Sequence, residues 1–216
     1  NLIVRNKKHE TIGPGNYWYS SISVGNDAGL SIRGPAEIHV TGDAAFDNIA
    51  ALNVSGPATF YVHGGISLRN NARMSFSAPA QFFVGGNVTF DNNSVLTAEA
   101  EVRFTIGGDL EIVNNARLNW SQNGPQPAAR LLFLLTTDGP HTVTLSNNAN
   151  VAAGIYAPDA AVALSNNAYL KGAVVGSTVD LDNKAEVTYD PSLEDVGVPG
   201  GTQGRWEAVA GSWSAR

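Results

Sequence analysis

The chain has 216 residues, of which 43% are hydrophobic and 15% are charged, which is enough for one elongated domain with a continuous apolar core. It contains no cysteine, so disulfides and thiolate chemistry are excluded. Its formal net charge of −6 at pH 7 argues against a general surface for binding polyanions.

The N-terminal segment, residues 1–19, begins with polar residues and has no apolar run that resembles a signal peptide or a membrane helix. An array of repeats follows it. The open end of such an array exposes unpaired backbone groups that need a cover. We therefore expect residues 1–19 to form an N-terminal cap or a linker.

From about residue 20 onward, residues of the same type return every 22 positions, which is typical of a chain wound into stacked coils. Two apolar series and one asparagine series keep this spacing. They are Val24, Phe46, Leu68, Phe90 and Ile112; Leu30, Leu52, Met74, Leu96 and Leu118; and Asn26, Asn48, Asn70, Asn92 and Asn114. Asparagine tolerates the positive φ of tight corners, and aligned asparagines can hydrogen-bond one another. We expect the asparagine series to form a structural ladder.

Each repeat also contains two apolar residues two positions apart, which is a strand pattern and not a helical one. Phe82 and Val84 are one such pair, and Gly86 follows them at a corner. Three short strands and three corners fit into 22 residues. The sequence therefore predicts an all-β fold, a right-handed parallel β-helix (β-solenoid) of about eight coils.

The predicted β-helix spans residues 20–193 and departs from the regular repeat after Leu118. A polar, proline-rich insertion at residues 121–130 precedes an apolar strand at residues 131–135. The next asparagine corners, at residues 147–149, 166–168 and 182–185, follow one another at shorter intervals. The coils should therefore become shorter toward the C-terminus, and residues 194–216 should form a C-terminal cap or tail.

One outward column of side chains is the first candidate for a binding function. It contains His39, Tyr61, Phe83 and Thr105 on successive predicted strands. Aromatic side chains that face solvent offer a stacking surface to a glycan, a base or a partner protein. The alternative is that the insertion or the tail after Pro191 covers this column.

Two arginines complete the set of candidate ligand-binding residues. Arg73 and Arg117 share a second outward column. Positive charge of this kind fits contacts with DNA phosphates, although the acidic balance of the whole chain opposes them.

Carboxylates raise the alternative of an enzyme, because parallel β-helices also carry many polysaccharide lyases and hydrolases. Asp47 and Asp91 share one column with Arg69 between them, and paired carboxylates can flank a glycosidic bond. No second catalytic group recurs beside them, so a ladder of alternating surface charges is the simpler interpretation. We expect no catalytic residues.

The four histidines are scattered and no metal motif is present. His39 and His63 lie 24 residues apart, on neighbouring predicted coils, but no carboxylate or third histidine recurs beside them. We expect neither a metal site nor a cofactor.

Several segments carry a resemblance to a known family. They are residues 13–22, 154–168, 170–176 and 179–193, and a closing tryptophan segment at residues 205–207. Together they resemble the β-solenoid module of bacterial PilX-type pilus-assembly and minor-pilin-like proteins. Family members carry an N-terminal pilin-like helix followed by this module outside the cell.

The resemblance implies a non-enzymatic module at the bacterial cell surface, in adhesion or in assembly of a type IV pilus. The implied partners are other pilus proteins or a surface glycan, and DNA for relatives associated with DNA uptake. Contact with a membrane would come only through a segment outside this chain. End-to-end association of two rods is a further expected contact, because solenoid ends expose unpaired strands.

Overall fold

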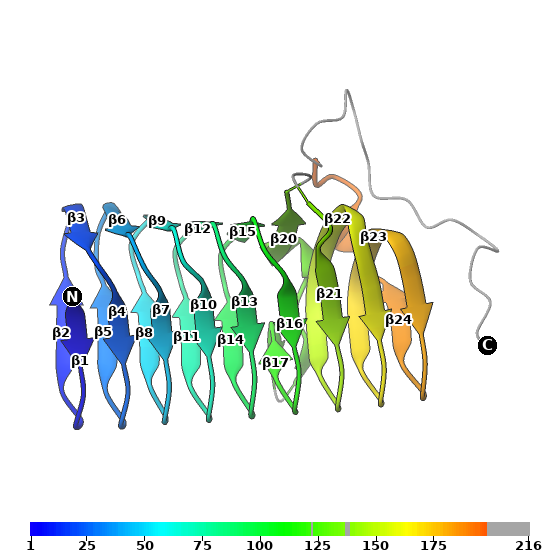
Figure 1. The fold of residues 1–216 in the computed structure, drawn as a ribbon, viewed down its shortest axis with the longest axis horizontal. Helices are drawn as coiled ribbons and strands as arrows, with labels where there is room; N and C mark the ends of the chain where they lie inside the picture. The colour runs from blue at the N-terminus through cyan, green and yellow to red at the C-terminus, as the bar shows by residue number, and fades with distance from the viewer. Residues whose placement is uncertain (122, 137–138, 198–216) are drawn as a thin grey trace.

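The computed structural model describes residues 1–121, 123–136 and 139–197. Within these residues the chain forms a parallel β-solenoid of about eight coils, stacked from the N-terminus to the C-terminal end (Figure 1). Each regular coil contributes one strand to each of three faces, and each strand pairs in parallel with the equivalent strand of the next coil. The expected all-β solenoid and its repeat length are confirmed.

The first face begins each coil, the second follows the asparagine corner, and the third closes the coil. The first face contains β1 (Leu2–Val4), β4 (Ile22–Val24), β7 (Ala44–Phe46), β10 (Ile66–Leu68), β13 (Val88–Phe90), β16 (Leu110–Ile112) and β21 (Thr142–Leu145). The second contains β2 (His9–Ile12), β5 (Gly29–Ile32), β8 (Ala51–Val54), β11 (Arg73–Phe76), β14 (Val95–Ala98) and β17 (Arg117–Leu118). The third contains β3 (Gly15–Tyr19), β6 (Ala36–Val40), β9 (Ala58–Val62), β12 (Ala80–Val84), β15 (Val102–Ile106) and β20 (Leu131–Leu135).

In the last coils two long strands turn corners without breaking, β22 (Asn150–Leu164) and β23 (Tyr169–Leu181). The short strand β24 (Glu186–Tyr189) follows them. Register confirms the expected shortening: Asn70 lies 22 residues before its equivalent Asn92, whereas Asn150 pairs with Tyr169 and Tyr169 pairs with Glu186. These last two pairs are 19 and 17 residues apart, because the corners of the late coils contain fewer residues.

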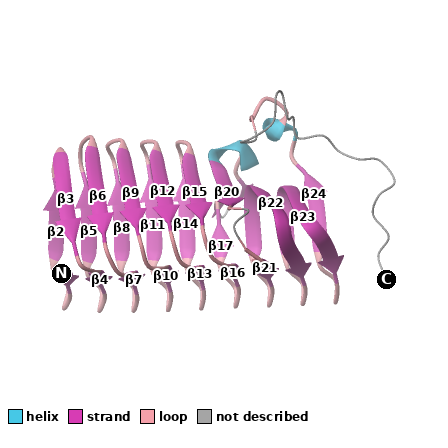
Figure 2. Ribbon diagram, turned by 45° about the horizontal axis from the view of Figure 1, so that its top comes forward, coloured by secondary structure: helices cyan, strands magenta, loops and turns pink. Residues whose placement is uncertain are grey.

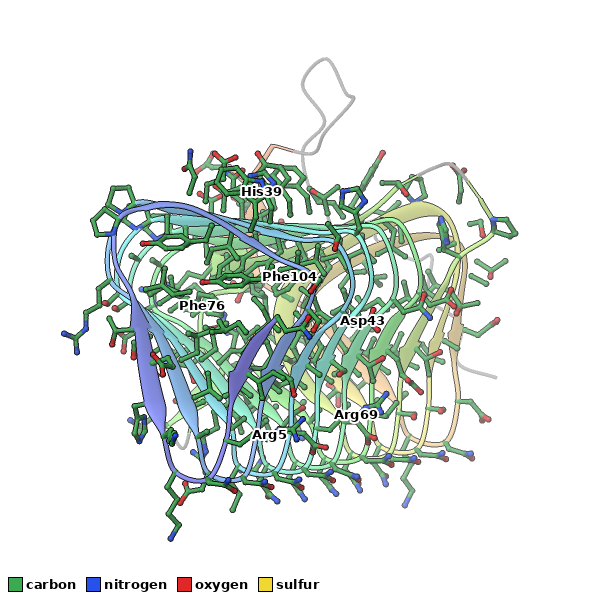
Figure 3. The ribbon with its side chains drawn as sticks, turned by 60° about the vertical axis from the view of Figure 1, so that its left-hand side comes forward. Arg5, His39, Asp43, Arg69, Phe76 and Phe104 are labelled. Atoms are coloured by element: carbon green, nitrogen blue, oxygen red, sulfur yellow. The ribbon has the colours of Figure 1, made fainter. Side chains whose placement is uncertain are left out.

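The core is a continuous apolar column between the three faces. Alternate side chains of each strand point inward, as the pleat requires, so a strand such as β12 buries Ala80, Phe82 and Val84 and turns the two residues between them outward. Phe104 lies inside the coil and His39 lies on the outer side of the third face (Figure 3). The rings of Phe60, Phe82 and Phe104 stack at centroid distances of 4.5 and 4.4 Å.

The asparagine corner joins the first and second faces. Two consecutive residues there adopt positive φ, for example Asn70 at 53° and Asn71 at 64°. Asn92 donates a side-chain hydrogen bond to Asn70 at 3.0 Å, and Asn114 accepts one from Asn147 at 2.9 Å. The asparagines thus hydrogen-bond from coil to coil, and the amides satisfy polar groups that the tight corner exposes.

Residues 1–19 form a coil of the solenoid and not the separate cap or linker that the sequence analysis expected. β1, β2 and β3 pair in parallel with β4, β5 and β6 of the next coil. This coil differs from the others at its inward positions, where Glu10 aligns with the buried Leu30 and Tyr17 aligns with the buried Ile38. Side chains with polar ends therefore occupy two inward positions of this coil.

The insertion follows β17 and folds as an antiparallel hairpin, β18 (Trp120–Ser121) with β19 (Gly124–Pro125), and the 3-10 helix η1 (Ala128–Arg130). A second 3-10 helix, η2 (Pro191–Leu193), follows β24. Figure 2 shows both helices over the C-terminal half of the stack. Most of the expected C-terminal cap or tail, residues 198–216, lies outside the described residues, and no helix among those described is long and apolar enough to cross a membrane.

Candidate functional site

The outer side of the third face carries two parallel columns of side chains. Because the strands pair in register, outward residues of successive coils line up along the axis. One column, called the aromatic column below, contains Trp18, His39, Tyr61 and Phe83. The other, called the polar column, contains Asn16, Glu37, Thr59, Gln81 and Arg103. Three of the candidates from the sequence analysis are thus brought together on one face.

The rings of the aromatic column stack on one another. Successive centroids from Trp18 to Phe83 are 5.2, 4.9 and 5.1 Å apart, with planes within 12° of parallel. The faces of the two inner rings, His39 and Tyr61, are therefore turned toward their neighbours. The two end rings keep one face free, and they are the most open to solvent: Trp18 is 67% exposed and Phe83 is 39% exposed.

The aromatic column ends at Thr105, which occupies the position after Phe83. Leu134 follows Thr105 in the same column and is buried. A hollow opens along the edge of the aromatic column, lined by Tyr61, His63, Phe83, Thr105 and Thr136 together with backbone at Gly85 and Gly107. A second hollow on the same face runs along the polar column and a row of prolines, Pro35, Pro57 and Pro79.

The insertion and η2 cover the later coils of the third face. Ala128 of η1, Leu132 of β20 and Leu193 of η2 form a small buried cluster, which we call the clip. Leu132 is the outward residue that follows Arg103 in the polar column. The insertion and the clip therefore cover the part of the third face where the outward residues are apolar, at Leu132. They leave Trp18 and Phe83 exposed.

Asp190 fastens the clip. Its carboxylate accepts hydrogen bonds from the backbone N–H of Ala128 at 3.1 Å and of Ser192 at 3.0 Å, and Lys171 Nζ lies 3.5 Å away. Burial would by itself raise the pKa of Asp190, but the hydrogen bonds from Ser192 and Ala128 and the charge of Lys171 lower it below the ordinary value.

Replacing Asp190 by asparagine should destabilise the clip at neutral pH by roughly 1–3 kcal/mol, since hydrogen bonds to a buried charge are lost. Because the folded-state pKa is lowered, the carboxylate stabilises the fold above its unfolded pKa of about 3.9. That contribution disappears as the pH falls through the folded-state pKa. Urea unfolding at pH 7 and at acidic pH should show a wild-type advantage that shrinks on acidification. Asp159→Asn, at an exposed carboxylate, is the control and should change little at either pH; equal behaviour of both variants would contradict the assignment.

Arg73 and Arg117 lie apart from the aromatic column. They are on β11 and β17 of the second face, and Val95 of β14 lies between them in register. Both are exposed. The structure therefore divides the five candidate residues between two faces, and no single ligand-binding surface contains all of them.

The carboxylates of Asp47 and Asp91 serve the asparagine ladder. Asp47 accepts hydrogen bonds from the backbone N–H of Asn48 at 2.8 Å and from Asn70 Nδ2 at 2.6 Å. Two repeats later, Asp91 accepts the equivalent hydrogen bonds from the backbone N–H of Asn92 and from Asn114 Nδ2. Both carboxylates are hydrogen-bonded to groups of the asparagine corner. They form a carboxylate–amide ladder, in place of the ladder of alternating charges through Arg69 that the sequence predicted.

The histidines also lie at separate places. His39 stacks within the aromatic column and its Nε2 lies 2.7 Å from Glu37 Oε1, whereas His63 follows β9 at the next corner. Within residues 1–121, 123–136 and 139–197, no group of three or more histidine, aspartate, glutamate or cysteine side chains is placed to hold a metal ion.

Sequence reasoning missed Trp18 and the hollow beside Phe83. Trp18 lies 21 residues before His39 and in register with it, so the column could have been extended by one coil if residues 1–19 had been treated as a repeat. Thr136 lines the hollow but follows the insertion in the sequence. The 22-residue spacing therefore does not relate Thr136 to Thr105, and periodicity could not predict that the two residues lie together.

The family comparison matches the second half of the rod. The model of a family described as a domain of unknown function, DUF7305, matches residues 79–196, which is more than half of the chain. The chain belongs to the DUF7305 family. The part matched by DUF7305 runs from the corner before β12 to the residues after η2, and so includes Phe83, Thr105 and the clip. No curated protein and no solved structure matches the chain.

Proposed function

We propose that this DUF7305 protein is a non-enzymatic binding module of a type IV pilus-associated, minor-pilin-like protein, displayed outside a bacterial cell. In this proposal the third face binds a surface glycan during adhesion. A structural contact with other pilus proteins during filament assembly is the second role of the same module. The resemblance of residues 13–22 and 154–193 to PilX-type solenoid modules supports the pilus context.

The exposed aromatic column carries the glycan proposal. Aromatic residues at the surface of a rod contribute nothing to its core, and a row of them marks a site of interaction. The polar column beside it supplies amide, hydroxyl and charged groups, including the ion pair of Arg103 with Glu101 at 2.9 Å. The free ring faces at the two ends of the column, next to hydrogen-bonding side chains, match a sugar, which has apolar C–H faces and a rim of hydroxyls.

The test of the glycan proposal is a binding screen of the purified domain on a glycan array. A ligand found there should bind at least about tenfold more weakly to a Tyr61→Ala/Phe83→Ala double variant, a difference of about 1.4 kcal/mol. Arg73→Ala/Arg117→Ala is the matched control, since it alters two exposed side chains on the second face. Saturable binding without turnover of the glycan, lost only in the aromatic variant, is the expected result.

The alternatives give different results in the same experiments. A DNA-binding module would bind double-stranded DNA with an affinity that falls steeply with salt and weakens in the arginine variant. A carbohydrate-active enzyme would degrade the glycan, and Asp47→Ala or Asp91→Ala would stop it. Absence of any glycan binding would contradict adhesion and leave protein partners in the pilus as the function to pursue.

A further inference from the structure

The aromatic column has a gap of one ring. Trp18, His39, Tyr61 and Phe83 fill four successive coils, and the buried Leu134 fills the sixth position. The fifth position is held by Thr105, whose short side chain leaves open the hollow beside Phe83. The free face of Phe83 therefore looks along the column toward a space and not toward another ring.

The size of this gap suits one six-membered ring. Strands of adjacent coils are about 4.8 Å apart, so Phe83 and Leu134 lie about 9.6 Å apart along the axis. The rings already in the column have centroids 4.9 to 5.2 Å apart. A single ring placed over Thr105 would keep the same spacing to Phe83 on one side and to Leu134 on the other.

The lining of the hollow indicates the chemistry of that ring. Thr105, Thr136 and Tyr61 contribute hydroxyl-bearing side chains, and His63 contributes an imidazole, while Phe83 contributes an apolar face. Among residues 1–121, 123–136 and 139–197, the lining contains no carboxylate, lysine or arginine. An uncharged ring with several hydroxyls and an apolar C–H face fits such a site better than a phosphate or a uronate does.

We propose that the hollow beside Phe83 and Thr105 is the primary subsite of the glycan site and holds one neutral pyranose ring, which continues the aromatic column over Thr105. This inference rests on the proposed glycan-binding function and assigns its position. The sugar stacks on Phe83, and the threonine hydroxyls meet its hydroxyl groups. The rest of the glycan extends along the polar column.

The test fills the gap. In Thr105→Tyr, a tyrosine at position 105 continues the stack of rings and occupies the subsite. Methyl glycosides of glucose, galactose and N-acetylglucosamine are titrated into wild type while the Thr105 and Thr136 methyl resonances are followed by NMR. We expect these two resonances to shift with saturation for at least one glycoside, and binding to weaken at least about tenfold in Thr105→Tyr.

Two control variants separate the subsite from general effects. Thr105→Ser keeps the hydroxyl and the open gap and should retain binding. Ser75→Tyr adds the same ring at an exposed position of β11 on the second face, away from the gap, and should also retain binding. Circular dichroism and thermal unfolding establish that each variant is folded, and Phe83→Leu, which removes the stacking face, provides a second loss-of-binding variant if Thr105→Tyr does not fold.

Every outcome decides the proposal. Saturable shifts at Thr105 that vanish in Thr105→Tyr support it. Shifts confined to the Trp18 ring, or full binding by a folded Thr105→Tyr, overturn the subsite and leave glycan binding elsewhere on the third face intact. Binding of phenol in place of every glycoside overturns the assignment to a sugar. No binding of any glycoside, together with a glycan array without ligands, overturns both the subsite and the proposed function.

Discussion

Phe82→Ala is expected to lower the free energy of unfolding by about 3–5 kcal/mol. The Phe82 ring is 2% exposed and stacks between Phe60 and Phe104. It also meets the edge of Phe76 at a centroid distance of 5.8 Å. Truncation would leave a cavity in the middle of a ladder whose strands are held at fixed spacing by backbone hydrogen bonds, so the coils cannot close over it. Urea unfolding followed by far-UV circular dichroism measures the change.

Phe83→Ala is the matched control, because residue 83 is next to Phe82 on the same strand and points outward. Its ring is 39% exposed and stacks on Tyr61. Loss of one such aromatic pair should lower stability by about 1 kcal/mol. Equal losses of stability for the two variants would show that the inward and outward assignment of β12 is wrong.

Gly172→Ala should destabilise the C-terminal coils by about 3 kcal/mol or more. Gly172 is buried in β23 and pairs with Ala153 of β22 on one side and Tyr189 of β24 on the other. A Cβ atom at this position would overlap the carbonyl oxygen of Ala153, which is a backbone atom of the neighbouring coil. Relief of that overlap requires the two strands to separate. The clip is destabilised as well, because the backbone N–H of Asp190 donates a hydrogen bond of 3.3 Å to the Gly172 carbonyl.

Gly13→Ala is the control for this substitution. A Cβ at Gly13 would have no atom within 4 Å, so the change in stability should stay within about 0.5 kcal/mol. Thermal unfolding of both variants, with limited proteolysis to locate the first cleavage, gives the comparison. A Gly172→Ala protein as stable and as resistant to proteolysis as Gly13→Ala would contradict the close approach of β22 and β23.

Aromatic rings stack in the same way on the inner side and on the outer side of the third face. Inside, Phe60, Phe82 and Phe104 stack along the axis, and outside, Trp18, His39, Tyr61 and Phe83 do the same. Both stacks follow from parallel strands in register, which place equivalent side chains at the strand spacing. The inner stack stabilises the rod, whereas the outer stack ends at Thr105, beside the hollow that Phe83 and Thr105 line.

The fold was predictable from the sequence because its information is local and repeated. A period of 22 residues, with pairs such as Phe82 and Val84 two positions apart, determines which side chains face inward, since the strand pleat has a period of two. The asparagine corners were predictable for a similar reason. Positive φ at Asn70 and Asn71 is a property of single residues, and the register then brings equivalent amides together.

The candidate site was predictable only in part. Periodicity placed His39, Tyr61 and Phe83 in one column and Arg73 and Arg117 in a second, but it did not show that the second column lies on another face. Residues 1–19 were assigned to a cap because they begin with polar residues and an open solenoid end needs a cover. Pairing of β3 with β6 makes them a coil and adds Trp18 to the column.

The amino-acid sequence alone determined the class of fold, the length of the coil, the inward and outward residues of each regular strand and the asparagine ladder. The tertiary structure alone decided that the outer rings stack face to face, that the insertion and η2 cover Leu132 and leave Phe83 exposed, and that Thr105 leaves a gap. The physical reason is the range of the interactions. Strand alternation acts between neighbours in the chain, whereas ring stacking and the clip join residues 21 to 62 positions apart, whose contacts exist only once the coils are wound.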